Sequence, residues 1–164
     1  IYSLLGVKTQ FSDHEDGKPT LVTITPRMGS VRKIDFDFNN CPDLAQTVVV
    51  TCCSLDIPFH FKGLTSLKIK ETDRIEALKR ELRKVGYIVR SANDSELIWD
   101  GTKCEPSMEP IDTYEDHRMA MAFAPLAIKF PGLAINNPEV VSKSYPTFWD
   151  DLKSAGFTIE EITD

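Results

Sequence analysis

Short segments rich in β-branched and aromatic residues recur along the chain, and this pattern predicts β-strands. In residues 34–38, apolar and acidic side chains alternate with a period of two, as in a strand with one buried face. Asn93 and Asp94 predict a tight turn between two neighbouring strands. The strands predicted in this way are residues 21–25, 34–38, 59–63, 87–90, 96–99, 133–136 and 157–159.

Two predicted helices are apolar on almost every side, which is typical of helices buried between other elements. The first covers residues 42–54 and is opened by Pro42 and Asp43. The second follows a capping signal at residues 113–116 and runs through Leu126, and we expect Pro125 to kink it or end it. Both helices are therefore expected in the interior of the fold.

Two further helices have ordinary surface patterns. Residues 73–85 place their apolar side chains on one face, Asp73 with Glu76 has the form of a capping box, and Gly86 ends the helix. The other helix covers residues 145–155. Residues 1–6 resemble the end of a helix, which indicates that the chain begins inside a longer protein.

The order of these elements from Ile34 onwards predicts a βαβαββ unit that occurs once in full and then nearly in full again. The predicted class is α/β (α+β). A length of 164 residues is enough for one domain with a sizeable core. No segment approaches the roughly 20 apolar residues that a membrane span needs.

The net charge of −6 argues against nucleic acid or an anionic membrane as a partner, because proteins that bind them are usually basic. The four cysteines have no spacing that suits a zinc site. We expect free, mostly buried thiols and a reducing compartment. These cysteines are Cys41, Cys52, Cys53 and Cys104.

Charged residues gather at three predicted helix starts. Lys70, Glu71 and Arg74 lie around the start of residues 73–85. A helix start presents unpaired N–H groups and a positive partial charge, so cations there favour an anionic ligand, and a carboxylate could transfer protons. Taken alone, this cluster also fits an exposed helix start with local ion pairs.

The other charged positions have equally plain interpretations when each is taken alone. Asp116, His117 and Arg118 open the second apolar helix, where Asp116 suits a cap and the cation suits an anion. Asp43 suits a cap of the first, and Lys143 suits an ordinary surface lysine. Together, however, they predict convergent helix starts that bind a polyanion and carry out acid–base chemistry.

Four motifs resemble those of the 5-enolpyruvylshikimate-3-phosphate synthase family, and they occur in the family's order. Residues 67–74 resemble the LRxKE(S/T)DR signature, and residues 114–123 contain the DHRMAMAF block. Residues 41–43 resemble the Pro-Asp pair that holds the family's catalytic aspartate, and residues 141–148 resemble the final KT(F/Y)PxF block. The resemblance spans residues 34–153, which is most of the chain.

The resemblance implies transfer of the enolpyruvyl group of phosphoenolpyruvate to the 5-hydroxyl of shikimate 3-phosphate, with release of phosphate and without a metal or organic cofactor. It implies that Asp43 accepts the hydroxyl proton and that Glu71 transfers a proton at the methylene carbon. It implies that shikimate 3-phosphate is bound by Asp43, Ser66 and Lys70, and that phosphoenolpyruvate is bound by Arg74, Arg118 and Lys143. It also implies that His117 supports this group of cations.

The resemblance also implies a cytoplasmic, two-lobed enzyme of the shikimate pathway of aromatic amino acid biosynthesis. Each lobe consists of repeated βαβαββ units with buried helices and outward-facing sheets. Residues 1–164 would form the C-terminal part of one lobe, so the chain needs the missing N-terminal part of its own protein. The partners are then the two anionic substrates, and the isolated chain is expected to be inactive.

Two alternatives stay open. One is the related transferase that acts on UDP-N-acetylglucosamine, although the amino-acid sequences of residues 70–74 and 116–123 favour the shikimate enzyme. The other is a non-catalytic anion-binding module of the same fold. Retention of Asp43 and Glu71 argues against it, because a simple anion binder has no use for two carboxylates.

Overall fold

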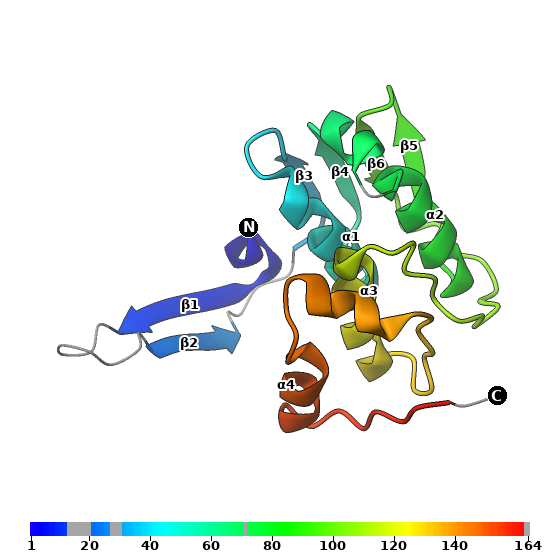
Figure 1. Ribbon diagram of the computed structural model, residues 1–164. Helices are drawn as coiled ribbons and strands as arrows, with labels where there is room; N and C mark the ends of the chain where they lie inside the picture. Colours follow the sequence, from blue (N-terminus) through cyan, green and yellow to red (C-terminus); the bar gives the residue numbers. More distant parts are fainter. Residues whose placement is uncertain (13–20, 27–30, 71, 163–164) are drawn as a thin grey trace.

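Two antiparallel strands, β1 (Val7–Ser12) and β2 (Leu21–Pro26), extend away from the rest of the molecule in the computed structural model (Figure 1). The structure describes residues 1–12, 21–26, 31–70 and 72–162. The short 3-10 helix η1 (Tyr2–Leu5) precedes β1 and ends at Gly6, as predicted from the sequence. Phe11 lies opposite Val22 on one face of the hairpin, and both side chains are exposed.

The larger sheet has four strands in the order β3-β4-β6-β5, with β3 parallel to β4 and β6 antiparallel to both of its neighbours. The strands are β3 (Ile34–Asp37), β4 (Phe59–Lys62), β5 (Arg90–Ala92) and β6 (Glu96–Trp99). Phe59 and Phe61 face the core, because alternate side chains of a strand point to the same face. Gly63 turns the chain after β4 at φ 73°, where a Cβ atom would lie 2.4 Å from Asp37 Oδ1.

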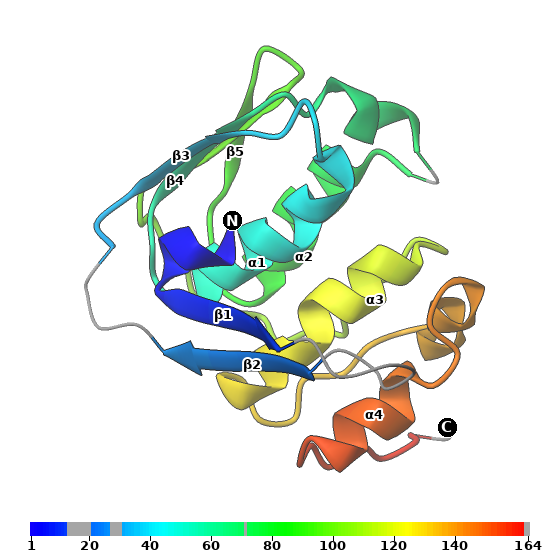
Figure 2. The same cartoon turned by 90° about the vertical axis from the view of Figure 1, so that its left-hand side faces the viewer.

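The α-helices are α1 (Ala45–Ser54), α2 (Arg74–Lys84), α3 (His117–Phe123) and α4 (Phe148–Ser154). They lie on one side of the larger sheet, with α1 and α2 next to it and α3 and α4 further away (Figure 2). The 3-10 helices that flank them are η2 (Pro42–Leu44), η3 (Thr65–Ile69), η4 (Ala124–Ile128) and η5 (Pro138–Lys143). Seven of the ten residues of α1 are buried, as its apolar pattern predicts.

The structure confirms the α/β class and most of the predicted helices. Strands and helices follow one another from β3 to β6 in the predicted order. Asp73 caps α2 by accepting hydrogen bonds from the backbone of Ile75 and Glu76. The second apolar helix leaves α-helical geometry at Ala124, immediately before Pro125, as expected for a proline.

Three predicted strands are wrong or displaced. Residues 133–136 form only a single bridge, between Ile135 and Ile111, because Asn137 takes a left-handed conformation and Pro138 has no N–H to continue a ladder. Residues 157–159 lie in no strand of the described structure. The strand predicted at 87–90 begins only at Arg90, because the chain before it closes the end of α2.

Two other segments also differ from the prediction. The last helix begins at Phe148 rather than at Tyr145, because the residue before a proline is disfavoured in a helix and Pro146 follows Tyr145. Strand β1 was not predicted, since its apolar side chains do not enter the core and its pattern is correspondingly weak. Among the described residues, no helix is both long and apolar enough to span a membrane.

Candidate active site

Three helix starts that are far apart in the sequence lie close together in the structure. Asp43 in η2, Arg74 at the start of α2 and Arg118 in the first turn of α3 are joined by hydrogen bonds and ion pairs. The starts of α1 and α3, with η3 and η5 beside them, occupy one side of the molecule (Figure 2). The predicted convergence of these helix starts is therefore present.

Asp43 is the anion at the centre of this group, and three cations surround it. Its Oδ1 lies 3.1 Å from Arg74 Nη1 and 3.4 Å from Lys70 Nζ. Its Oδ2 lies 3.6 Å from Arg118 Nη2, and its backbone carbonyl accepts a hydrogen bond of 3.1 Å from Arg118 Nη1. The Asp43 side chain is 43% exposed, so the carboxylate is open to solvent and to a ligand.

The charge state of Asp43 follows from these neighbours. Burial is the largest influence and disfavours the charged form, but the cations Arg118, Lys70 and Arg74 together outweigh it. The pKa of the Asp43 carboxyl therefore lies below its usual value of 3.8. At neutral pH the group is an anion that accepts hydrogen bonds.

Arg74 is held from the opposite side by a second carboxylate, that of Asp116. Arg74 Nε donates to Asp116 Oδ2 at 2.6 Å, and Nη2 donates to Oδ1 at 3.3 Å. Arg74 is 1% exposed and Asp116 is fully buried. A guanidinium held by two oxygens in this way has a fixed orientation, so Arg74 is a rigid part of the site.

The other described residues of the predicted site make no hydrogen bond or ion pair with Asp43 in the described structure. Lys143 is exposed at the end of η5, and its Nζ donates to the carbonyl of Glu115 at 2.7 Å. His117 begins α3, and its Nδ1 is buried without a hydrogen-bond partner in the described structure. Ser66 is half-buried in η3. Glu71, predicted as a catalytic residue, lies outside the described residues.

Two buried residues that support the site were not predicted in that role. Asp116 was predicted as a cap, and it does cap α3, because it accepts a hydrogen bond from the Arg118 backbone N–H at 2.8 Å. Its pairing with Arg74 was not predicted. Gln46 is fully buried in α1 and donates to Asp116 Oδ2 at 3.5 Å. A lone amide inside an apolar helix is a signal that could have identified Gln46, because buried polar groups need a partner.

A depression of about 730 Å³ lies elsewhere, between α2 and residues 104–114, and no described residue of the predicted site lines it. Arg80, Arg83 and Lys84 contribute cations to it, while Glu105, Glu109 and Asp112 contribute acids. The candidate site is therefore defined by the convergence of charged side chains rather than by this hollow.

The sequence model of one protein family, EPSP synthase (3-phosphoshikimate 1-carboxyvinyltransferase), matches residues 10–152. The match covers most of the chain and includes every described residue of the site. The chain belongs to the EPSP synthase family.

Curated relatives support this assignment. A 3-phosphoshikimate 1-carboxyvinyltransferase of Bacteroides fragilis is 54% identical over 161 residues, which are 98% of this chain and 38% of the relative. A relative of the same name from Photobacterium profundum is 37% identical over 129 residues, which are 79% of this chain and 30% of the relative. One from Burkholderia cenocepacia is 39% identical over 122 residues, 74% of this chain and 28% of the relative. The chain thus spans less than two fifths of the length of these relatives.

Proposed function

We propose that the full-length protein containing this chain transfers the enolpyruvyl group of phosphoenolpyruvate to the 5-hydroxyl of shikimate 3-phosphate. One observation carries the proposal: Asp43, an exposed carboxylate, is surrounded by Lys70, Arg74 and Arg118 from separate elements. Fixed cations around a carboxylate suit a reaction in which two anionic substrates meet and a proton must be removed.

Asp43 is the proposed base for the 5-hydroxyl. In the free protein its pKa is low, which makes it a weak base. A bound phosphate or carboxylate would partly neutralise the positive charge of Lys70 and Arg118, and the Asp43 anion would then be stabilised less. Its pKa would then rise when the substrates are present, at the stage when a stronger base is needed.

The other site residues would bind and orient the substrates. Lys70 and Ser66 would contact shikimate 3-phosphate, whereas Arg74, Arg118 and Lys143 would contact phosphoenolpyruvate. His117, whose buried Nδ1 has no hydrogen-bond partner among the described residues, would support this group of cations. Glu71 would transfer the proton at the methylene carbon.

We further propose that these 164 residues form the C-terminal part of one lobe of a cytoplasmic, two-lobed enzyme built from repeated βαβαββ units. The order β3, α1, β4, α2, β5, β6 supports this architecture. The chain then supplies one wall of the site. The isolated chain should release no phosphate from the two substrates, and release at the rate of the full-length protein would contradict this.

The central test is Asp43→Ala in the full-length protein. Loss of a general base lowers turnover by about 10²–10⁴-fold, so phosphate release should fall in this range while the melting temperature changes little. Asp35→Ala is the matched control, because Asp35 is an exposed acid on β3 that pairs with Lys33 and His60 rather than with a site residue, and turnover of this variant should stay normal.

Two outcomes would change the proposed function. Unchanged turnover in Asp43→Ala would support a binding module in which Asp43 has no chemical role. Thermal protection of the full-length protein by UDP-N-acetylglucosamine, and not by shikimate 3-phosphate, would support the related transferase.

A further inference from the structure

A buried carboxylate on α2, that of Glu81, holds the segment that leads into the site. Glu81 is fully buried, and both of its oxygens are used. Oε1 accepts from the Tyr114 hydroxyl at 2.5 Å, and Oε2 accepts from the Asp112 backbone N–H at 2.9 Å. Lys84 Nζ, 2.7 Å from Oε2, balances the charge. A buried anion with this many donors is a strong and specific anchor.

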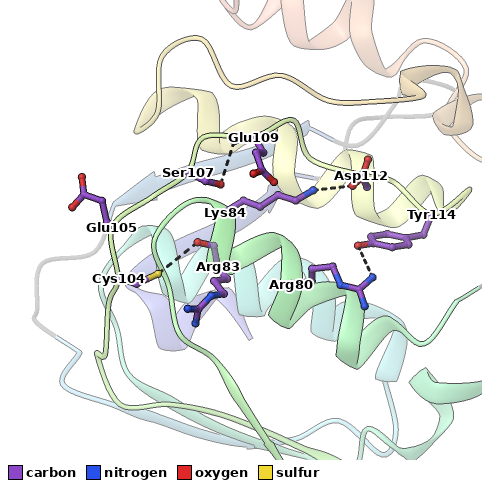
Figure 3. Close-up of a pocket in the computed structure, with 9 residues that line it drawn as sticks. All are labelled: Arg80, Arg83, Lys84, Cys104, Glu105, Ser107, Glu109, Asp112 and Tyr114. Carbon is purple, nitrogen blue, oxygen red and sulfur yellow. Dashed lines mark hydrogen bonds and ion pairs between the residues drawn. The ribbon is translucent and has the colours of Figure 1, made fainter.

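Lys84 strengthens the same attachment. Its Nζ also donates to the Pro110 carbonyl at 2.9 Å and to Asp112 Oδ2 at 2.8 Å. Figure 3 shows Lys84 reaching Asp112, and Tyr114 with Arg80 alongside, on the wall of the depression between α2 and this segment. Residues 110–114 are thus fixed to α2 by polar contacts at several points.

Tyr114, the last residue of this anchored segment, and Glu115 after it have an unfavourable backbone conformation. Tyr114 has φ 54° and Glu115 has φ 56°, so two consecutive residues with side chains occupy the left-handed region. Each costs free energy and persists only where its surroundings fix it. The Tyr114 hydroxyl is fixed by Glu81, and the Glu115 carbonyl is fixed by Lys143 Nζ.

Burial, followed by Glu81, raises the pKa of Tyr114, so its hydroxyl stays protonated and continues to donate. Asp116, which follows Glu115, caps α3 and holds Arg74. Two residues later, Arg118 reaches Asp43. The left-handed turn therefore sets the position at which α3 begins and the direction of its site residues.

We propose that Tyr114 and Glu81 are positioning residues of the enzyme: their hydrogen bond maintains the left-handed turn at residues 114–115 and thereby directs Asp116 and Arg118 into the site. The part of this inference that concerns turnover rests on the proposed function. It assigns neither residue a contact with a substrate.

The first test is Tyr114→Phe in the full-length protein. The ring stays and the hydroxyl is lost, so the turn loses one of its two fixed points. We expect kcat/KM for phosphoenolpyruvate to fall about ten-fold, because a misplaced Arg118 binds the reacting group less well. The KM for shikimate 3-phosphate should change less. Ile57→Val, a small core change beyond the far end of α1, controls for a general loss of stability and should leave both constants unchanged.

A rescue variant separates positioning from simple destabilisation. Glu115→Gly removes the conformational penalty at φ 56°, because glycine adopts positive φ without strain. Alone it should keep normal kinetics, and combined with Tyr114→Phe it should restore most of the lost kcat/KM. Normal kinetics for Tyr114→Phe, or a loss that Glu115→Gly does not restore, would overturn the inference.

A second measurement does not depend on turnover. In hydrogen exchange of the full-length protein, Tyr114→Phe should speed exchange in peptides from residues 113–123 more than in peptides from α1, and Glu115→Gly should reverse this. Equal changes in both regions would overturn the inference. If the unmodified protein transfers no enolpyruvyl group, the proposed function fails, and the exchange data still decide whether the turn is held as proposed.

Discussion

Residues 34–99 and residues 111–162 organise their apolar side chains in different ways. The first region forms a four-stranded sheet backed by two helices, and its side chains make up most of the main core. The second forms short helices and 3-10 turns with one isolated bridge, and no residue of α4 is buried. A strand-like sequence becomes a strand only where a neighbouring backbone can pair with it along several residues.

The two regions meet at the site. Asp43 and Arg74 come from the first region, and Asp116 and Arg118 come from the second. The polar contacts across this boundary thus connect the region of the four-stranded sheet to a region that contributes few residues to the main core. The stability of the second region should therefore depend on the first.

The largest expected effect comes from breaking this connection. Arg74→Met leaves Asp116 buried without its ion-pair partner and should lower the free energy of unfolding by about 3–5 kcal/mol. Arg90→Met is the control, because Arg90 pairs with exposed Asp100, and such pairs contribute about 0–1 kcal/mol. Denaturant unfolding of the chain measures both. Equal losses would show that the buried pair gives no special support.

The same substitution in the two regions should have unequal effects. Leu78→Ala opens a cavity under α2 and should cost about 2–5 kcal/mol, since Leu78 is fully buried. Leu152→Ala on α4 should cost much less, because Leu152 is only half-buried and belongs to neither apolar cluster. If urea unfolding gives similar losses for both variants, the two regions are packed alike and the comparison fails.

The smallest expected effect is on the way in which the free energy of unfolding changes with pH under acidic conditions. The pKa of Asp43 is lowered in the folded chain, so the stabilisation from its charge is complete well above pH 3.8 and is lost as the pH falls through the lowered pKa. Asp43→Asn should therefore flatten the loss of stability at acidic pH, by less than about 1 kcal/mol because solvent screens the group. Asp150→Asn, at an exposed position on α4, should leave the acid profile unchanged, and an equal flattening there would contradict the role of Asp43.

The sequence predicted the parts of the fold that depend on local patterns. The apolar run of α1, the cap of α2 by Asp73 and the break before Pro125 all follow from neighbouring residues. The strand predicted at 133–136 did not form, because a ladder requires a partner segment and Pro138 interrupts it. Local pattern does not reveal the presence or absence of such a partner.

The same distinction applies to the site. Asp43, Lys70 and Arg118 were predicted from charges at helix starts, and the structure brings them together. The pairing of Arg74 with Asp116 and that of Glu81 with Tyr114 join residues 42 and 33 positions apart. No local rule links such residues, so these contacts become visible only in the folded chain.

The buried cysteines of α1 give the protein its own chemical reporter of unfolding. Burial raises the pKa of the Cys52 thiol to about 12, and burial followed by the charges of Cys52 and Asp56 raises that of Cys53 as well. Only a thiolate reacts quickly with an alkylating reagent, so both thiols stay inert while α1 remains packed. Cys41 and Cys104 are half-buried and can react from the folded state. The slow pair therefore records how often the interior opens, and the fast pair shows that the reagent was active.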